Sequence, residues 1–223
     1  MLNLIQSMEP LTEVAPVWNI PVWTAVYPNT KNLDKMRIWI IENEPRLIEK
    51  YKTYDVRNDG GTGLGLESLT AQYNKFNLFS ETQDVEEFQD LLQFIRSEYV
   101  KFMEEMKFAV RDCLLYSWAN VMRSGQSVDR HNHGATHYAY LSGNMHFDNY
   151  ETTTTYYNPY GEVHYDFANV KGGLTFFPSY LPHGTNKHME EQNRVSMAFD
   201  LLDKNHMRGN DTNCISLFEE NNV

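Results

Sequence analysis

The stretch "GGLTFFPSYLPHGTNKHMEEQNRVSMAFDLL", residues 172–202, decides the fold class. Both of its ends are rich in aromatic and β-branched residues, and a polar segment with Pro, Gly and Asn separates them, which is typical of two strands joined by a connection. Four more segments of this kind follow residue 113: "LLYSWANVM", "THYAYLSGNMHF", "TTTTYYN" and "EVHYDFANV". Several short strands at hairpin spacing predict a mainly β protein, an antiparallel sandwich or jelly roll.

The N-terminal half carries helical patterns instead. Residues 1–30 mix prolines with aromatic and β-branched residues, which predicts an irregular arm with one or two short strands. Residues 32–51 and 82–113 place apolar side chains at intervals of three and four, as the buried face of an amphipathic helix does. Because proline removes a helical hydrogen bond, we expect Pro45 to break or offset the first helix.

These patterns predict one structural domain with three parts. Residues 1–113 are expected to form a helical part that packs on the outer face of one sheet, residues 114–203 the β core, and residues 204–223 a C-terminal tail. The glycines of "GGTGLG" (60–65) do not have the dinucleotide-binding spacing, so we expect a flexible loop without a function. The threonine-rich segment 151–157 is expected to be an edge strand with a solvent-exposed face.

Composition and charge exclude several classes of function. The chain has 223 residues, and its hydrophobic content of 41% is enough for a globular core. A net charge of −11 repels phosphate backbones, so nucleic acid is not an expected partner. Two cysteines without a CxxC pattern, no signal peptide and no long apolar run favour a cytoplasmic protein without a membrane partner. Self-association into a homo-oligomer stays open.

The stretch "RHNHGATHYAYLSG" (130–143) concentrates histidines and raises the question of a metal site. Alternate residues of a strand point to the same side, so His131 and His133 can converge on one ion. His183 follows an apolar strand and a Pro-Ser turn, and it is the candidate for a third ligand. Two near ligands and a distant third suit an open site with free positions for dioxygen and substrate. The remaining histidines, His137 among them, are expected to be ordinary surface or core residues.

A pocket for an anion is expected beside these histidines. In "NRVSMAFD" (193–200), strand alternation puts Arg194 and Ser196 on one face and large apolar residues on the other. A guanidinium that points into a barrel requires an anionic partner, to which Ser196 can donate a further hydrogen bond. Four more residues are candidates to line this pocket: Tyr138 and Tyr140, which share a strand face and would hydrogen-bond a cosubstrate, and, with weaker support, Trp118 and Asn120.

Together these motifs resemble the 2-oxoglutarate- and Fe(II)-dependent oxygenases of phages and bacteria. "HNH" with "SGNMHF", "GGLTFFPSYLPHGTN" and "RVSMAFD" are similar to that family's H-x-H and Ser-Gly strand, its Phe-Pro-Ser segment ending in His, and its closing Arg-x-Ser strand. The resemblance covers residues 114–203 and implies a double-stranded β-helix. It also implies that His131 and His183 bind iron, and that Arg194 and Ser196 hold the distal carboxylate of 2-oxoglutarate.

The activity that this resemblance implies is a dioxygenase reaction. Dioxygen and 2-oxoglutarate would be consumed while an unidentified substrate is hydroxylated, and the setting would be the host cytoplasm if the chain is phage-encoded. His133 stands where most 2-oxoglutarate oxygenases carry Asp or Glu. It either replaces the carboxylate as the third ligand, which removes one negative charge, or lies beside the ligands while water or an acid such as Asp129 completes the set. Three neutral imidazoles suit iron, zinc or nickel.

The chain is also similar to the cupins, another family of metal-binding jelly rolls. Gly125 and the H-x-H that follows it resemble the first cupin motif, and Gly172, Pro178 and His183 resemble the second. The alternative is therefore a cupin-like metal-binding protein without 2-oxoglutarate chemistry, such as a virion or interaction component. This alternative leaves Arg194 and Ser196 unexplained.

Overall fold

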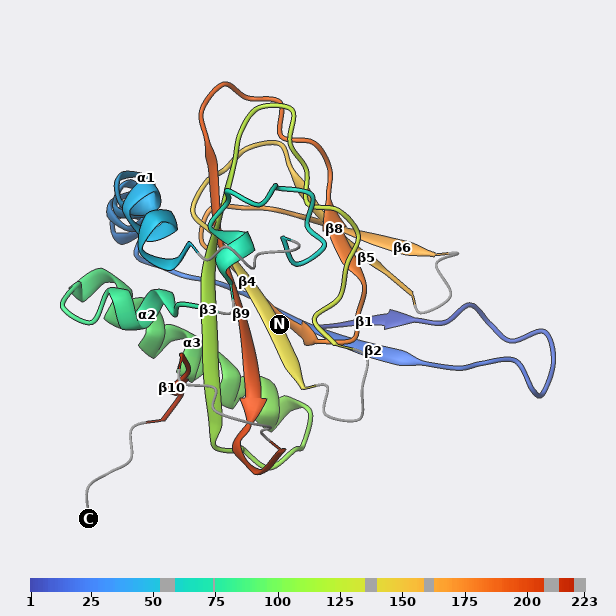
Figure 1. Ribbon diagram of the computed structural model, residues 1–223. Coiled ribbons are helices and arrows are strands. Elements are labelled where there is room, and N and C mark those ends of the chain that lie inside the picture. Colours follow the sequence, from blue (N-terminus) through green and yellow to red (C-terminus); the bar gives the residue numbers. More distant parts are fainter. Residues whose placement is uncertain (53–58, 74, 135–139, 159–162, 207–212, 219–223) are drawn as a thin grey trace, which may run out of the picture.

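Two antiparallel sheets make up most of the computed structural model, which describes residues 1–52, 59–73, 75–134, 140–158, 163–206 and 213–218. The strands are β1 (Leu2–Gln6), β2 (Asn19–Val26), β3 (Cys113–Met122), β4 (Leu141–His146), β5 (Thr153–Tyr157), β6 (His164–Ala168), β7 (Gly173–Pro178), β8 (His183–Thr185), β9 (Arg194–Asp203) and β10 (Ile215–Ser216). The larger sheet has the order β1-β2-β7-β4-β9-β3-β10, and the smaller one has the order β6-β5-β8 (Figure 1). The prediction of a mainly β jelly roll is confirmed.

The helices cover the outer face of the larger sheet (Figure 1). They are α1 (Thr30–Tyr51), α2 (Leu78–Glu81) and α3 (Glu86–Glu105), with short 3-10 turns η1 (Thr70–Gln72) and η2 (Lys204–His206). The main core joins α1 and α3 to the sheet residues that alternation assigned to packing, Val195, Met197 and Phe199. A second apolar cluster, with Val22, Tyr156 and Phe177, lies between the two sheets.

Both helix predictions need correction: the first helix is not broken at Pro45, and the second ends earlier than expected. Helix α1 runs through Pro45 without a break, and the buried residue Leu47 beyond it continues the stripe of Met36 and Ile40. Packing of this stripe therefore outweighs the lost hydrogen bond. Helix α3 ends at Glu105, well before residue 113, because Lys107 adopts a positive φ of 57° and the chain turns toward β3.

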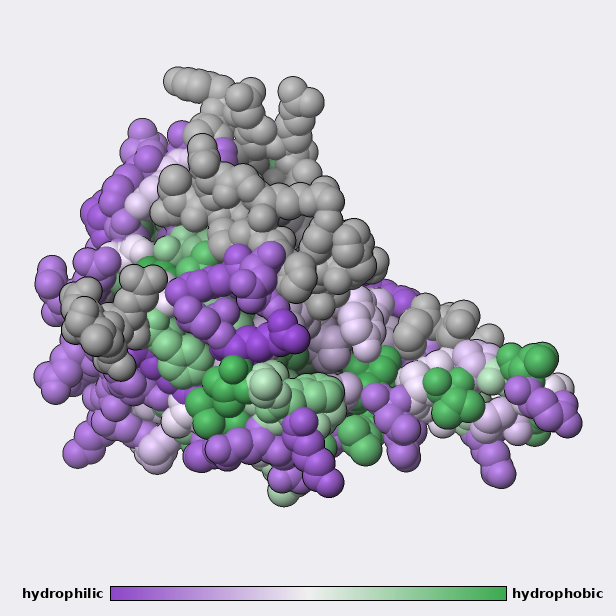
Figure 2. Space-filling model, turned by 90° about the horizontal axis from the view of Figure 1, so that it is seen from below, coloured by the Kyte–Doolittle hydropathy of each residue, from purple (hydrophilic) through white to green (hydrophobic). Residues whose placement is uncertain are grey.

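Strand β5 is not an edge strand, contrary to the sequence-based expectation. It lies between β6 and β8, and Thr154 is only 3% exposed and hydrogen-bonds Asn169. The expected short strands of the N-terminal arm are present as β1 and β2, which extend the larger sheet. Their connection, residues 7–18, projects from the body with apolar side chains on it (Figure 2). Four of these are exposed: Met8, Leu11, Val14 and Val17.

Candidate metal centre and anion pocket

Backbone pairing brings the predicted histidines together. His131 and His183 form an isolated antiparallel bridge, in which each backbone N–H donates to the other residue's carbonyl at 2.9 and 2.8 Å. The His133 N–H donates to the Ser179 carbonyl at 2.9 Å. Gly184 permits this close approach, because a Cβ there would lie 2.9 Å from the Val128 carbonyl oxygen. In the pair His183-Gly184, the glycine thus leaves room for the backbone of residues 128–130 beside the histidine.

The three imidazole rings face one another. One ligand nitrogen from each of His131, His133 and His183 lies within 4.8 Å of the other two, and the Nε2 atoms of His131 and His133 are 3.3 Å apart. Ring centroids are separated by 4.5 to 5.2 Å. Among the residues that the structure describes, this is the one group of three or more His, Cys, Asp or Glu with metal-site spacing.

The outer nitrogen of each ring has an acceptor, and this fixes the tautomers. His131 Nδ1 lies 2.7 Å from the Asp129 carbonyl oxygen, and His183 Nδ1 lies 3.0 Å from the Leu181 carbonyl oxygen. His133 Nδ1 lies 2.6 Å from Asp200 Oδ1. Since these oxygens only accept, each Nδ1 carries a proton and each Nε2 presents a lone pair. The three Nε2 lone pairs therefore converge, as in a metal site. The rings cannot hydrogen-bond one another there, because none of the three Nε2 atoms carries a proton.

Electrostatics keeps two of the rings neutral. Burial, and then the neighbouring His133, lowers the pKa of His131. Burial lowers the pKa of His183 well below its usual range, and His133 and His131 add to this effect. Neutral imidazole is the form that binds metal, so the donor set fits a borderline divalent ion such as Fe(II).

An anion pocket adjoins the histidines in the same cavity. Its lining includes Arg194, Ser196 and Ala198 on β9, and His146 on β4, so the predicted alternation of β9 is correct. Trp118 and Asn120 of β3 also line the cavity, as the sequence suggested. The cavity is therefore bounded at one end by the histidine rings and at the other by a guanidinium.

The Arg194 guanidinium lacks the carboxylate partner that its burial calls for. The residue is 3% exposed, and its nitrogens contact Met122 Sδ at 2.9 Å and His146 Nδ1 at 3.2 Å. Within the described ranges no carboxylate oxygen lies within 4 Å of it, and the nearby Asp148 pairs with Arg37 instead. Burial lowers the Arg194 pKa to about 10, so the group remains charged at neutral pH. A buried cation with two weak neutral acceptors is well suited to a small anion.

The neighbouring histidine, His146, is neutral. Burial, followed by the charge of Arg194, lowers its pKa well below the usual range. Because Arg194 can only donate, His146 Nδ1 accepts, and the ring proton therefore sits on Nε2.

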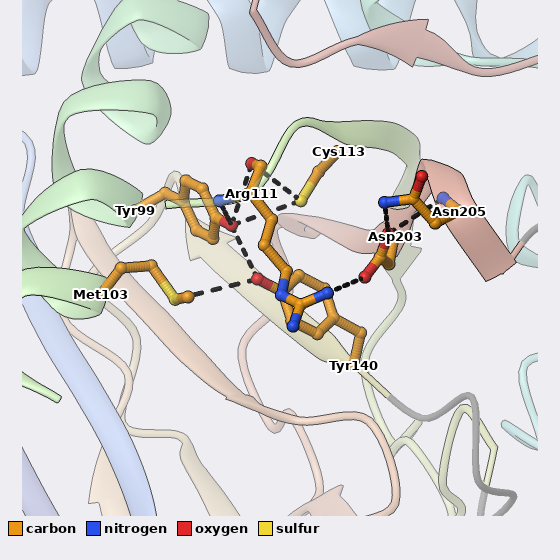
Figure 3. Close-up of polar contacts among 7 residues, drawn as sticks. All are labelled: Tyr99, Met103, Arg111, Cys113, Tyr140, Asp203 and Asn205. Carbon is orange, nitrogen blue, oxygen red and sulfur yellow. Dashed lines mark hydrogen bonds and ion pairs between the residues drawn. The ribbon is translucent and has the colours of Figure 1, made fainter. Parts of the chain in front are cut away.

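Tyr140 does not reach this cavity, so the expected cosubstrate contact is not formed. Its hydroxyl lies 2.7 Å from the Tyr99 hydroxyl and 3.8 Å from Met103 Sδ, both on α3 (Figure 3). The Tyr99 hydroxyl also lies 3.3 Å from Cys113 Sγ. Tyr140 thus belongs to a polar cluster on the helix-covered side of the sheet. The expectations for Tyr138 and His137 fall on residues outside the described ranges.

Three residues at the site were missed from the sequence. His146 was assigned to the ordinary histidines, and Asp200 was not considered, although it continues the alternation of Arg194, Ser196 and Ala198 by one more step. Thr62, in the glycine-rich loop that was given no function, lines the cavity, and its carbonyl accepts from the Asp129 N–H at 2.8 Å. Gly63 lies so close that a Cβ would be 2.5 Å from Asp129 Oδ2.

Fold and site thus define a jelly roll with a three-histidine candidate metal centre and an anion pocket, and comparisons with known proteins agree. Residues 116–200 match the family described as "Putative 2OG-Fe(II) oxygenase". No curated protein matches the sequence. A Pseudomonas putida prolyl-4-hydroxylase is similar in fold, with a TM-score of 0.54 at 12% identity over 84% of this chain and 93% of that one.

Two further solved structures share this fold. The first is a prolyl hydroxylase from Trichoplax adhaerens in complex with a hypoxia-inducible-factor peptide, with a TM-score of 0.53 at 9% identity over 82% of this chain and 84% of that one. The second is the epimerase SnoN in complex with Fe3+, alpha-ketoglutarate and nogalamycin RO, with a TM-score of 0.51 at 8% identity over 82% and 78%.

The chain carries a 2OG-Fe(II) oxygenase domain over residues 116–200, and its fold is the double-stranded β-helix of the solved structures that it resembles. It is therefore a non-haem oxygenase that uses Fe(II), with 2-oxoglutarate and dioxygen as cosubstrates. In the described part of the chain, no helix combines the length and the apolar character needed to cross a membrane.

Proposed function

We propose that this oxygenase hydroxylates a C–H bond of its substrate, with Fe(II) held by His131, His133 and His183. The observation that carries this assignment is the convergence of three Nε2 lone pairs, each ring oriented by a Nδ1–H bond to an oxygen. Bound iron supplies the redox chemistry by which dioxygen converts 2-oxoglutarate to succinate and carbon dioxide and the second oxygen atom enters the substrate. The metal-binding residues leave one side of the ring cluster open to the cavity.

In this proposal Arg194 and Ser196 hold the distal carboxylate of 2-oxoglutarate. Arg194 provides a buried positive charge that lacks a carboxylate partner among the described residues, and Ser196 lines the same cavity one strand repeat away. Charge-assisted hydrogen bonds of this kind fix both the position and the direction of a carboxylate. The ketoacid end of the cosubstrate then extends toward the histidines, since the two groups bound the same cavity.

A second cavity beside the His131 and His133 rings is the proposed entrance for the substrate. It has a volume of about 110 Å³, shares Thr62 and Trp118 with the first cavity, and is also lined by Gly60, Thr70, Tyr73, Asn132 and Asp200. The Trp118 and Tyr73 rings, 5.6 Å apart, form an apolar wall that can exclude water from the reacting group.

The cupin-like alternative is less well supported. It uses the same three histidines but gives no role to the buried Arg194 in the same cavity. The family match, in contrast, spans the segments that carry the histidines and the strand that carries Arg194. A cytoplasmic, phage-encoded setting, self-association and the exclusion of nucleic acid as a partner stay predictions that rest on the sequence.

An anaerobic titration tests the proposal. Addition of Fe(II) and 2-oxoglutarate to the wild type should produce a visible charge-transfer band, and admission of oxygen should release succinate. His183→Ala should abolish the band, and Arg194→Ala should weaken it. His188→Ala is the matched control, because His188 is buried and bonds the Gln192 carbonyl at 2.6 Å, outside the cavity lining. A wild type with neither band nor succinate would refute the proposal.

A further inference from the structure

Among the described residues, Asp200 is the one acidic residue whose carboxylate forms a hydrogen bond to any of the three histidines, and it bonds His133. Its Oδ1 accepts from His133 Nδ1 at 2.6 Å and from the Ser142 hydroxyl at 2.5 Å. The Asp200 side chain is 20% exposed and that of His133 is 8% exposed, so the contact is largely shielded from solvent. A carboxylate is thus held against the outer nitrogen of His133, the ring that stands where most 2-oxoglutarate oxygenases carry Asp or Glu.

The position of Asp200 is fixed by the central strands. It lies on the same face of β9 as Arg194 and Ser196, and it is the cross-strand partner of Ser142 on β4. Ser142 is fully buried, so the hydrogen bond that orients the carboxylate is protected. Two neighbouring strands of the sheet therefore hold the pair in place more firmly than a loop would.

The three histidines differ in what their outer nitrogens contact. His131 and His183 donate to backbone carbonyls, which are neutral, whereas His133 donates to a carboxylate. A carboxylate on the outer N–H raises the basicity of an imidazole and strengthens it as a metal ligand. Within the described ranges no Lys or Arg nitrogen lies within 4 Å of the Asp200 carboxylate to neutralise it.

We propose that Asp200 supplies through the His133 ring the negative charge that a carboxylate ligand would supply directly. This inference rests on the proposed function, since it takes His133 as a metal ligand. Asp200 is a positioning and charge-supplying residue in this scheme, with Ser142 holding it in place. The metal centre is then a unit of four residues: the three histidine ligands, and Asp200 bonded to the outer nitrogen of His133.

The test must separate charge from geometry. Asp200→Asn keeps an oxygen that can accept from His133 Nδ1 and removes the charge. Asp166→Asn is the matched control, because Asp166 is an exposed strand residue that accepts from the Thr155 hydroxyl at 2.6 Å, away from the cavity. Fe(II) affinity is measured anaerobically by competition with a chromogenic chelator, without substrate or oxygen.

Wild type and Asp166→Asn should bind Fe(II) equally, and Asp200→Asn should bind it about 10- to 100-fold more weakly. In a His133→Asp background, where the carboxylate is itself a ligand, Asp200→Asn should change the affinity less than twofold. A role confined to holding the ring would leave the Asn variant with wild-type affinity, and this result would overturn the inference. An equal loss in both backgrounds would also overturn it, since the effect would not pass through His133.

Two further measurements keep the outcomes distinct. If Asp200→Asn folds poorly by circular dichroism, Asp200→Ser, a smaller neutral variant, takes its place with the same expected loss. If the wild type itself binds Fe(II) no better than His183→Ala, the proposed function fails. If the wild type binds well and Asp200→Asn matches it, only the role of Asp200 fails.

Discussion

Replacement of Arg194 by methionine should weaken cosubstrate binding and stabilise the protein without cosubstrate. Arg194 is 3% exposed, and its guanidinium nitrogens contact the Met122 thioether and the neutral His146 imidazole. Burial lowers its pKa from the ordinary arginine range to about 10, which corresponds to a penalty of about 3 kcal/mol on the charged form. Methionine removes this penalty and loses some packing, so we expect the cosubstrate-free variant to be about 1–2 kcal/mol more stable than the wild type.

Binding of 2-oxoglutarate should reverse the order of stability, so that the wild type becomes more stable than Arg194→Met. A carboxylate on Arg194 gains two charge-assisted hydrogen bonds, each worth about 1.5–3 kcal/mol. The Kd of Arg194→Met should therefore rise roughly a hundredfold or more. At a concentration of 100 times its Kd, 2-oxoglutarate stabilises the wild type by about 2.7 kcal/mol and the variant hardly at all.

Urea denaturation with and without 2-oxoglutarate, with Zn(II) in place of iron to prevent turnover, measures both effects. Arg123→Met is the control, since Arg123 also forms a charged contact, an ion pair at 2.6 Å with the buried Glu44, but does not line the cavity. That variant should be destabilised under both conditions and keep the wild-type Kd. The reasoning is refuted if Arg194→Met binds 2-oxoglutarate within tenfold of wild type, or if it is the less stable protein without cosubstrate.

Three further outcomes are expected. Tyr140→Phe should leave the 2-oxoglutarate Kd within twofold of wild type in calorimetry and lower the free energy of unfolding by about 0.5–1.5 kcal/mol, because it loses the hydroxyl contacts to Tyr99 and Met103 and none in the cavity; a large change in Kd would contradict the position of its ring. Gly143→Ala should cost about 1–3 kcal/mol in urea denaturation, since its Cβ would meet the Phe199 ring and lie 2.5 Å from a backbone oxygen; unchanged stability would contradict the strand pairing. Burial raises the pKa of Cys113, so its thiol stays protonated and iodoacetamide should modify it only in denaturant, as mass spectrometry can show; rapid labelling of the native protein would count against its burial.

Strand alternation explains why the sequence predicted one face of β9 and failed at Tyr140. From Arg194 onward the pleat is regular, so Arg194, Ser196 and Ala198 line the first cavity, and the same rule extended by one step would have found Asp200, which lines the second cavity. In β4 the even-numbered residues also face the cavity, and His146 is one of them. Tyr140 is even-numbered as well, but β4 begins at Leu141, so the rule no longer holds at its position.

The remaining failures came from contacts between distant segments. Nothing near Pro45 in the sequence shows that the helix beyond it is held by packing against the sheet. Thr62 reaches the cavity because the Asp129 segment bonds its backbone, a pairing of residues far apart in the chain. The contact between His133 and Asp200 likewise depends on the register of β4 and β9, which hydrophobic patterns do not specify to the residue.

The charges of the site give a reason for an acid behind His133. Bound iron and 2-oxoglutarate carry opposite charges of equal size, so the balance of the cavity depends on the protein. Arg194 adds one positive charge, and a family member with an Asp or Glu ligand cancels it within the metal centre. Three neutral imidazoles leave it uncancelled, which is costly in a buried cavity. Asp200, about 20 Å along β9 from Arg194 and bonded to His133, restores the balance without entering the ligand set. In this scheme, Asp200 supplies behind the His133 ring the charge that an Asp or Glu ligand would supply within the ligand set.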